Sequence, residues 1–442
     1  MNRIQPWLAA SAIALLPCAA LALPVVVQLP AGAMPSQLTA AALADATQPL
    51  ALQLPDGSNG VLPAQRRDYG NGRIGTVGRR HDGLRFYGFV SGERMLSADV
   101  YTRTGHYELV SYQSRPYWIS ARAESTKSDA LLRPTSRAST AAAPIVSPDA
   151  NGIYEISVLV LHTPLYAARM APTSPEEEAQ RLVFLASEYM VTSAVPVRYK
   201  LAGVAPYTGT DENSGFYDNL ASMVGNPQVS ALRNRTEADL VVLLRSQDGN
   251  ADLCGLSSGF NNFERSDPPE HIDTERDAYN VAGLAPAEGS SASCFDDVFA
   301  HELGHSLAAG HDYAGSAGFQ YWKPYAHALP CLNANGMKYF SLMWSLGVGP
   351  GGGRSELITN PDLLLDGQTC GATGVDGIEA SQANNARAMR EAAPYVAAYR
   401  GKATVSSDGG GTVSVNAGGS LAALTSLGLA LFGFGRQRRS RA

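Results

Sequence analysis

Two histidines and a glutamate form the most specific chemical signal in this 442-residue chain. His301 and His305 are four residues apart, so on a helix both imidazoles leave the same face, at the spacing with which two ligands hold one metal ion. Glu302 follows His301 directly and points about 100° further around such a helix, where it can take a proton from a metal-activated water. The three residues therefore predict a helix that carries a hydrolytic metal centre.

A third histidine completes the predicted ligand set. His311, six residues after His305, can reach the same ion only if the helix ends and the chain turns back. Gly310 is predicted to supply this turn, because glycine tolerates a positive φ. Three imidazoles leave a fourth position open, which is typical of catalytic zinc. Isolated histidines on an apolar helix usually have no ligand role, but a third one at this offset makes a chance match much rarer.

This pattern resembles the extended zinc motif of the metzincin metallopeptidases. Its positions here are His301, Glu302, His305, Ala308, His311 and Asp312. Asp312 is similar to the aspartate of the reprolysin (adamalysin-like) branch and its bacterial secreted relatives, and we expect it to anchor the end of the helix. The family has glycine where Ala308 stands, and a left-handed alanine costs roughly 1 kcal/mol, so Gly310 could shift the turn by two residues.

The resemblance covers residues 153–400 and implies an α/β metzincin zincin fold, with a mixed twisted sheet, an active-site helix and a methionine turn under the zinc. Met343 matches that turn better than Met337 does. Two residues later stands Ser345, not the tyrosine that some metzincins add as a ligand, so three histidines and a water are expected. The implied reaction is hydrolysis of protein peptide bonds by a zinc-activated water, with Glu302 as general base and then general acid.

The start of the chain predicts export. Residues 1–22 have an early arginine, an apolar core and an Ala-Leu-Ala end, as in a secretory signal. Export implies an oxidising compartment, in which an even number of cysteines suggests disulfides. Four cysteines remain after the signal, and of their three pairings we favour the one between sequence neighbours, Cys254 with Cys294 and Cys331 with Cys370.

Five parts are predicted along the chain. They are a signal peptide (1–22), a β-rich propeptide-like domain (23–120), a linker (121–150), a metzincin catalytic domain (151–402) and a tail (403–442).

Two parts of the chain differ in charge. Residues 23–145 contain 13 Lys and Arg against 9 Asp and Glu, whereas residues 146–420 contain 16 against 31, so the two parts would attract each other. Neither balance is typical of a nucleic-acid binder, and no nucleic-acid partner is expected.

The region before the catalytic domain resembles the propeptide of secreted reprolysin-like enzymes. Alternating runs predict strands at 85–90, 95–101 and 106–112, and the linker is rich in Ser, Thr, Ala and Pro, as in a cleavage region. This region has no cysteine after the signal, so a cysteine thiolate on the zinc is excluded for it. His81 and His106 are interpreted as ordinary loop and strand residues.

Local patterns predict the elements of the catalytic domain. A buried strand is expected at 155–161, a helix capped by Ser174 to about residue 193, and strands at 197–204 and 238–244. A long polar loop follows, and a cleft-edge strand is expected within it near 278–282. His271 in that loop is interpreted as solvated. Tyr339 and Phe340 either line the substrate pocket or pack in its wall.

The tail resembles a glycine-glycine C-terminal sorting signal of Gram-negative bacteria, which is cut by a rhombosortase. Glycine pairs precede an apolar run at 421–434, too short for a stable span of about 20 residues, and arginines follow. The resemblance implies export machinery and a tail-processing protease as partners, transient membrane contact, and a secreted or cell-surface location. The alternative is a plain amphiphilic end.

The leading hypothesis is a secreted zinc endopeptidase that acts on protein or peptide substrates. An alternative from another class is a catalytically silent cell-surface binding module that retains the metzincin fold. A zinc hydrolase with a substrate other than protein is a further alternative. No sequence motif supports calcium, because the acidic stretch 273–277 lacks the spacing of a calcium loop.

Overall fold

The computed structural model describes most of residues 33–400. Within this range it leaves out residues 46, 55–58, 81, 103–104, 113–114, 121–127, 132–144, 211–213, 247–252, 260–273, 286–293, 295, 315, 317–320, 333–335, 337, 345–352, 366 and 376. The expected signal peptide and sorting tail lie outside the described residues, as do His81, His271, Met337 and Ser345.

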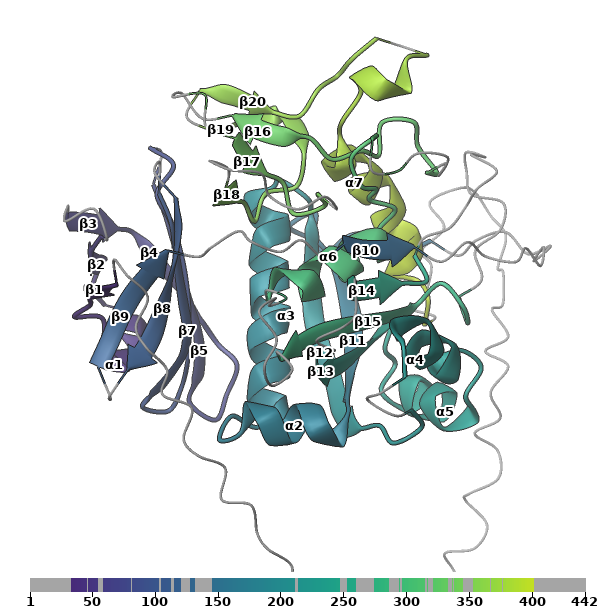
Figure 1. The fold of residues 1–442 in the computed structure, drawn as a ribbon, viewed down its shortest axis with the longest axis horizontal. Helices are drawn as coiled ribbons and strands as arrows, with labels where there is room; N and C mark the ends of the chain where they lie inside the picture. Colours follow the sequence, from purple (N-terminus) through teal and green to yellow (C-terminus); the bar gives the residue numbers. More distant parts are fainter. Residues whose placement is uncertain are drawn as a thin grey trace, which may run out of the picture.

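A six-stranded mixed sheet forms the centre of the C-terminal part, in the order β10-β14-β15-β13-β11-β12 (Figure 1). The strands are β10 (Ser128–Leu131), β11 (Tyr154–His162), β12 (Val197–Pro206), β13 (Leu240–Ser246), β14 (Leu253–Ser257) and β15 (Tyr279–Ala285). β11, β12, β13 and β15 run parallel, whereas β14 is antiparallel to β15. This arrangement confirms the expected α/β class with a mixed sheet.

Local signals explain the main elements of this part. β11 is apolar and buried along nearly its whole length, as a strand covered on both faces should be. The long helix α3 (Pro175–Thr192) begins with a complete capping box between Ser174 and Glu177, which satisfies two otherwise unpaired backbone N–H groups. The shorter helices are α2 (Pro164–Met170), α4 (Phe216–Met223) and α5 (Pro227–Arg235).

The expected cleft-edge strand was assigned to the wrong segment. β15, which covers the predicted residues 278–282, lies inside the sheet with β13 on one side and β14 on the other. β14 lies next to β15 on the side away from β13, and β10 pairs with the other side of β14 and forms the edge of the sheet. An apolar strand of this length has the same sequence pattern in the middle of a sheet and at its edge. Only the strand pairing in the structure distinguishes these two positions.

The connecting segment contains more structure than a linker. Within the predicted linker, β10 runs parallel to β14, with Ser128 opposite Leu253 and Leu131 opposite Ser257. A register shift lies between Ser128 and Ala130. The described residues Ser128–Leu131 of this segment therefore form the edge of the six-stranded sheet.

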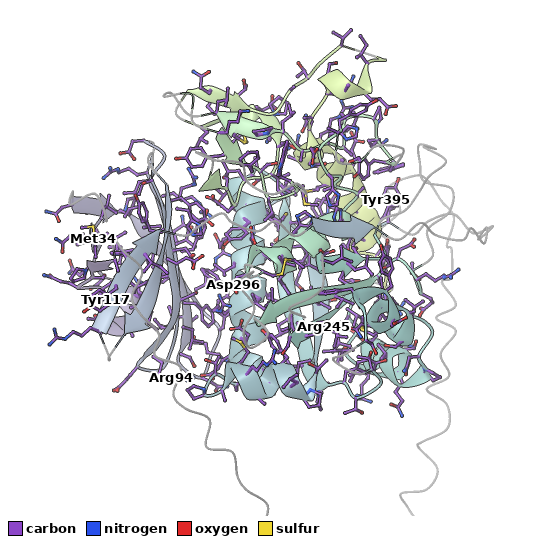
Figure 2. The ribbon with its side chains drawn as sticks, viewed as in Figure 1. Met34, Arg94, Tyr117, Arg245, Asp296 and Tyr395 are labelled. Atoms are coloured by element: carbon purple, nitrogen blue, oxygen red, sulfur yellow. A yellow bond between two sulfur atoms is a disulfide. The ribbon has the colours of Figure 1, made fainter. Side chains whose placement is uncertain are left out.

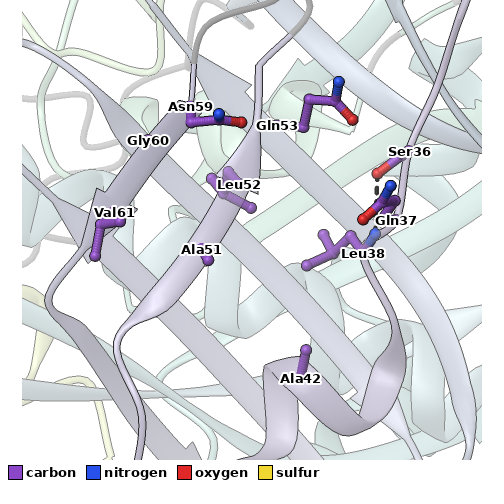
Figure 3. Close-up of a pocket in the computed structure, with 10 residues that line it drawn as sticks. All are labelled: Ser36, Gln37, Leu38, Ala42, Ala51, Leu52, Gln53, Asn59, Gly60 and Val61. Carbon is purple, nitrogen blue, oxygen red and sulfur yellow. Dashed lines mark hydrogen bonds between the residues drawn. The ribbon is translucent and has the colours of Figure 1, made fainter.

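A seven-stranded sheet forms the N-terminal part, in the order β1-β9-β8-β7-β6-β5-β4. Its strands are β1 (Met34–Pro35), β4 (Ala64–Asp68), β5 (Arg73–Arg79), β6 (Arg85–Ser91), β7 (Arg94–Tyr101), β8 (His106–Tyr112) and β9 (Arg115–Ser120). Helix α1 (Ala40–Ala44) and the hairpin of β2 (Leu50–Gln53) and β3 (Asn59–Leu62) accompany this sheet. A cavity of about 420 Å³ lies between Ser36–Leu38, Ala42 and this hairpin, and none of its lining residues belongs to the predicted metal site (Figure 3).

Small strands and one helix complete the C-terminal part. They are β16 (Pro330–Leu332), β17 (Lys338–Phe340), β18 (Gly353–Arg354), β19 (Asn360–Leu365), β20 (Gln368–Cys370), the 3-10 helix η1 (Glu379–Ser381) and α7 (Asn385–Val396). The structure joins Cys331 of β16 to Cys370 of β20, and Cys254 of β14 to Cys294. In the described part of the chain, no helix is long and apolar enough to cross a membrane.

Candidate metal centre

Helix α6 (Asp297–Ser306) carries two of the predicted ligands and the predicted base. Val298, Phe299 and Leu303 belong to the main hydrophobic core and hold the helix between α3 and the sheet. His301 and His305 leave the helix one turn apart, as their spacing predicts, and both are buried.

The structure brings the three histidines together at their Nε2 atoms. His301 Nε2 lies 2.9 Å from His305 Nε2 and 3.2 Å from His311 Nε2, and 2.9 Å separates the Nε2 atoms of His305 and His311. Three nitrogens about 2.1 Å from one ion at tetrahedral angles would lie roughly 3.4 Å apart, so the triangle has nearly the size of a zinc site. All three side chains are buried, which is also typical of ligands and not of surface histidines.

Backbone carbonyls hold the second ring nitrogen of two of these histidines. His301 Nδ1 donates to the carbonyl oxygen of Leu342 at 2.6 Å, and His305 Nδ1 donates to that of Ala309 at 2.8 Å. Because a carbonyl oxygen can only accept, the proton belongs on Nδ1, and Nε2 is then the nitrogen that can ligate a metal. The residues present therefore fit one zinc ion.

The turn that returns His311 to the site lies at Ala308 and not at Gly310. Ala308 has φ +65°, in the left-handed region, so the prediction that Gly310 supplies the positive φ was wrong. Gly310 is required for space instead, because a Cβ there would overlap the Ala326 carbonyl and the Tyr321 ring. The Asn385 side chain holds this glycine in place, accepting from its N–H at 2.9 Å and donating to its carbonyl at 2.8 Å.

Met343 is buried directly against the metal-site helix. A Cβ on Gly304 would lie 2.5 Å from Met343 Sδ and 3.2 Å from its Cε, so only glycine allows the methionine this close. The preceding residue, Leu342, provides the carbonyl that orients His301. Sequence reasoning did not identify Gly304, although a glycine in the middle of a helix is a signal that could have found it.

Glu302 is completely buried, and its carboxylate lies against β14. A Cβ on Gly255 of β14 would overlap Glu302 Oε1 and would lie 2.5 Å from Glu302 Cδ. The disulfide between Cys254 and Cys294 ties this strand to the segment just before α6. β14 therefore passes directly beside the predicted general base, and Gly255 is a site residue whose role the sequence did not reveal.

The remaining residues that the sequence singled out have structural surroundings. Asp312 is buried, and its carbonyl accepts hydrogen bonds from Ser316 N at 2.9 Å and Ser316 Oγ at 2.6 Å. Tyr339 belongs to a small apolar cluster, and the Phe340 ring centre lies 5.0 Å from that of Trp344. These contacts favour packing in the wall over a direct role in a substrate pocket.

His106 lies in a second group of potential ligands, away from the histidine triangle. Its Nε2 is 3.0 Å from Asp99 Oδ1, and Glu108 completes a set whose ligand atoms lie within 4.8 Å of one another. The His106 ring also stacks on Tyr101 with 4.1 Å between ring centres. Burial opposes the charge of His106, but the hydrogen bond and the charge of Asp99 raise its pKa, and these contacts are those of a strand residue hydrogen-bonded to its neighbour Asp99.

A mixed sheet, a helix with two histidines and a glutamate, and a third histidine beyond a turn define a metallopeptidase-like domain. Residues 154–340, which include the helix, the three histidines and all strands of this sheet except β10, match the reprolysin model described as metallo-peptidase family M12. This part of the chain is therefore similar to reprolysin-like metallopeptidase domains.

A relative from Pseudomonas aeruginosa, described as a peptidyl-Asp metalloendopeptidase, is 30% identical over 182 residues. The match covers 39% of this chain but only 28% of the relative. Two solved structures share 12% sequence identity with the chain. Metalloproteinase-II from Bacteroides fragilis has a TM-score of 0.35 over 62% of this chain and 85% of its own. A chaperone-substrate complex has a TM-score of 0.40 over 69% of this chain and 39% of its own.

Proposed function

We propose that the chain is a zinc-dependent endopeptidase that hydrolyses peptide bonds in proteins. The observation that carries this proposal is the buried triangle of Nε2 atoms, in which two histidines donate from Nδ1 to backbone carbonyls and direct Nε2 toward a common point. The match to the M12 family and the relative from P. aeruginosa support it.

The residues divide the chemistry between them. His301, His305 and His311 would hold the ion, and zinc, when bound, supplies Lewis-acid chemistry that acidifies water and polarises a carbonyl. Glu302 takes a proton from the attacking water and delivers it to the leaving amine. Beside this carboxylate, the backbone of β14 offers N–H and C=O groups on which an extended peptide can align.

The chain is proposed to be made in a latent form. β10, from the segment that joins the two parts, pairs with β14 on the side where an extended substrate would add to the sheet. Two strands cannot occupy the same edge, so β10 would compete with substrate until the segment is cut. The pairing of β10 with β14 is the observation that supports latency.

Export is proposed as well, by the signal at 1–22 and the sorting tail at 403–442. The two disulfides support a mature enzyme outside the cytoplasm, because such bonds persist in oxidising compartments. Secretion or attachment to the surface of a Gram-negative cell follows from this proposal.

The central experiment compares the chain from residue 23 to 420, after limited proteolysis of the connecting segment, with its Glu302→Gln form treated in the same way. We expect about one zinc per molecule in both proteins, and chelator-sensitive casein cleavage only in the first. Glu176→Gln, which removes an exposed carboxylate from α3, is the matched control and should cleave like the parent. Folded protein without zinc would refute the proposal.

The same experiment tests the alternatives. Zinc in both proteins without cleavage by either would favour the silent binding module or a hydrolase for another substrate. The name of the P. aeruginosa relative supports including peptides with and without aspartate in the assay. Faster cleavage at aspartate would extend its named specificity to this chain.

A further inference from the structure

The central part of helix α3 is buried on all sides. Residues 181–190 are buried without interruption, whereas a helix on a protein surface keeps one polar, exposed face. One side of α3 packs on β12 and α6 of the catalytic part, and the other side packs on β5 and β6 of the N-terminal sheet. Figure 1 shows the sheet alongside α3, with β14 and β10 on the far side of this helix. The N-terminal sheet therefore completes the burial of a catalytic-domain helix.

The N-terminal sheet is also buried on both faces where it meets α3. In β6, Phe86 points into the sheet's own core, whereas Tyr87 and Phe89 point the other way and join the core of the catalytic part. All three rings are 0% exposed. An antiparallel sheet usually leaves one face to water, so this second apolar face requires a partner.

Aromatic rings interlock across this interface. The Phe89 and Phe184 ring centres lie 5.7 Å apart, and those of Tyr87 and Tyr189 lie 5.4 Å apart in an edge-to-face arrangement. A Cβ on Gly75 of β5 would lie 2.5 Å from the Phe184 ring, so the sheet reaches this helix closely only because a glycine stands there. Such complementarity is typical of permanent interfaces and protein interiors.

Ion pairs also connect the N-terminal sheet to the catalytic part. Glu188 of α3 is fully buried and pairs at 2.8 Å with both Arg67 and Arg79 of the N-terminal sheet. Glu356, also fully buried, pairs with Arg85 and accepts a hydrogen bond from Tyr87 Oη at 3.2 Å.

A third pair involves Arg94, which is labelled in Figure 2. Its Nη2 is 2.7 Å from Glu177 Oε1, and both side chains are partly exposed. In the part of the chain that the structure describes, the cations of these pairs come from the sheet and the anions from the catalytic part.

From these contacts we infer that the N-terminal sheet is a permanent subunit of the folded enzyme, which stays bound to α3 after the connecting segment has been cut. Its release would expose the aromatic face of the sheet and the matching face of α3 together. The removable element is then β10, and the sheet acts as a structural partner of the catalytic part. This inference does not depend on peptidase activity.

The test uses the full chain with a recognition site for a sequence-specific protease inserted between Glu124 and Ser125, so that β10 stays on the C-terminal fragment and only the contacts of the sheet hold the N-terminal fragment. The Glu302→Gln background prevents the protein from cutting itself. After cutting, we expect both fragments to elute together in gel filtration at about 1 μM and to separate only in denaturant. Separation of the two fragments in native buffer would overturn the inference. Zinc content and casein cleavage are measured separately. The association of the two fragments can therefore be interpreted even if the proposed function is wrong.

Two phenylalanines of one strand provide a matched pair of variants. Phe89→Ala removes a ring from the interface and should speed dissociation of the cut protein about tenfold or more. Phe86→Ala removes an equally buried ring from the sheet's own core and should leave dissociation nearly unchanged while lowering the stability of the sheet. Equal dissociation rates for the two variants would contradict the inference.

A milder variant covers the case in which Phe89→Ala does not fold. Glu188→Gln keeps the size of the side chain and removes the charge that Arg67 and Arg79 share, so dissociation should again be about tenfold faster. Retention as tight as in the parent at low and high salt would count against the interface described here.

Discussion

Replacing Gly255 by alanine should disable the predicted base without removing the metal. The added Cβ would overlap Glu302 Oε1 and would lie 2.5 Å from Glu302 Cδ and 2.8 Å from its Cγ. Since non-bonded carbons prefer about 3.5–4.0 Å, one of the two groups must retreat by about 1 Å. β14 is paired with β15 and tied by the Cys254–Cys294 disulfide, so we expect the Glu302 side chain to move.

A displacement of about 1 Å in a catalytic group can cost about 100-fold in rate, or roughly 2.7 kcal/mol in the activation barrier. We expect Gly255→Ala to lower kcat/KM for peptide cleavage by about this factor with zinc content unchanged. Gly203→Ala in β12 of the same sheet is the control, because its Cβ would meet neighbours no closer than 3.2 Å. Activity of Gly255→Ala within about threefold of the parent would refute the assignment of Glu302 as a base held against β14.

Three further predictions concern stability. Ala308→Gly removes strain of roughly 1 kcal/mol at φ +65° but adds flexibility to the unfolded chain, so its Tm should rise by at most a few degrees. Gly310→Ala should lower the Tm, because the added Cβ has no space. Calorimetry measures both values, and a lower Tm for Ala308→Gly would contradict the strain argument. Burial, the largest influence, raises the pKa of Glu108 from 4.5 to about 7, so the folded state holds this proton more tightly than the unfolded state does. Stability from this group is then fully present below about pH 4.5 and is lost as the pH rises to about 7, and Glu108→Gln should flatten that part of a Tm-against-pH curve; an unchanged curve would contradict it. Removing zinc with a chelator should destabilise the fold, by about 4 kcal/mol relative to zinc at a thousand times its Kd, and a Tm that does not respond to zinc would contradict binding at the triangle.

Much of the local structure could be predicted because short-range interactions determine it. The capping box at Ser174 predicts the start of α3, and the apolar run at 155–161 predicts β11, since both signals lie within a few residues of the element they specify. The spacing of His301 and His305 predicts their common helix face for the same reason. The five-part division of the chain and the roles of the site residues remain predictions, which the experiments above address.

The errors have a common origin in contacts between distant parts of the chain. Glycine is the residue that best tolerates a positive φ, so Gly310 was a reasonable choice for the turn. The structure instead places Ala308 there and leaves Gly310 close to the Ala326 carbonyl. Likewise, the sequence of β15 does not reveal that β14 lies outside it, because pairing partners are chosen across the whole sheet.

By itself, the sequence determined the chemistry: three imidazoles and a carboxylate at spacings that a helix and a turn can bring to one ion. Only the tertiary structure decided how these side chains are positioned and buried. The carbonyl that orients His301 and the strand beside Glu302 come from segments tens of residues away. The arginines that neutralise Glu188 and Glu356 come from more than a hundred residues away. Periodicity and capping depend on residues within one or two helical turns, whereas burial depends on which surfaces of the folded chain pack together. For this reason the burial of α3 on both sides is visible only in the tertiary structure.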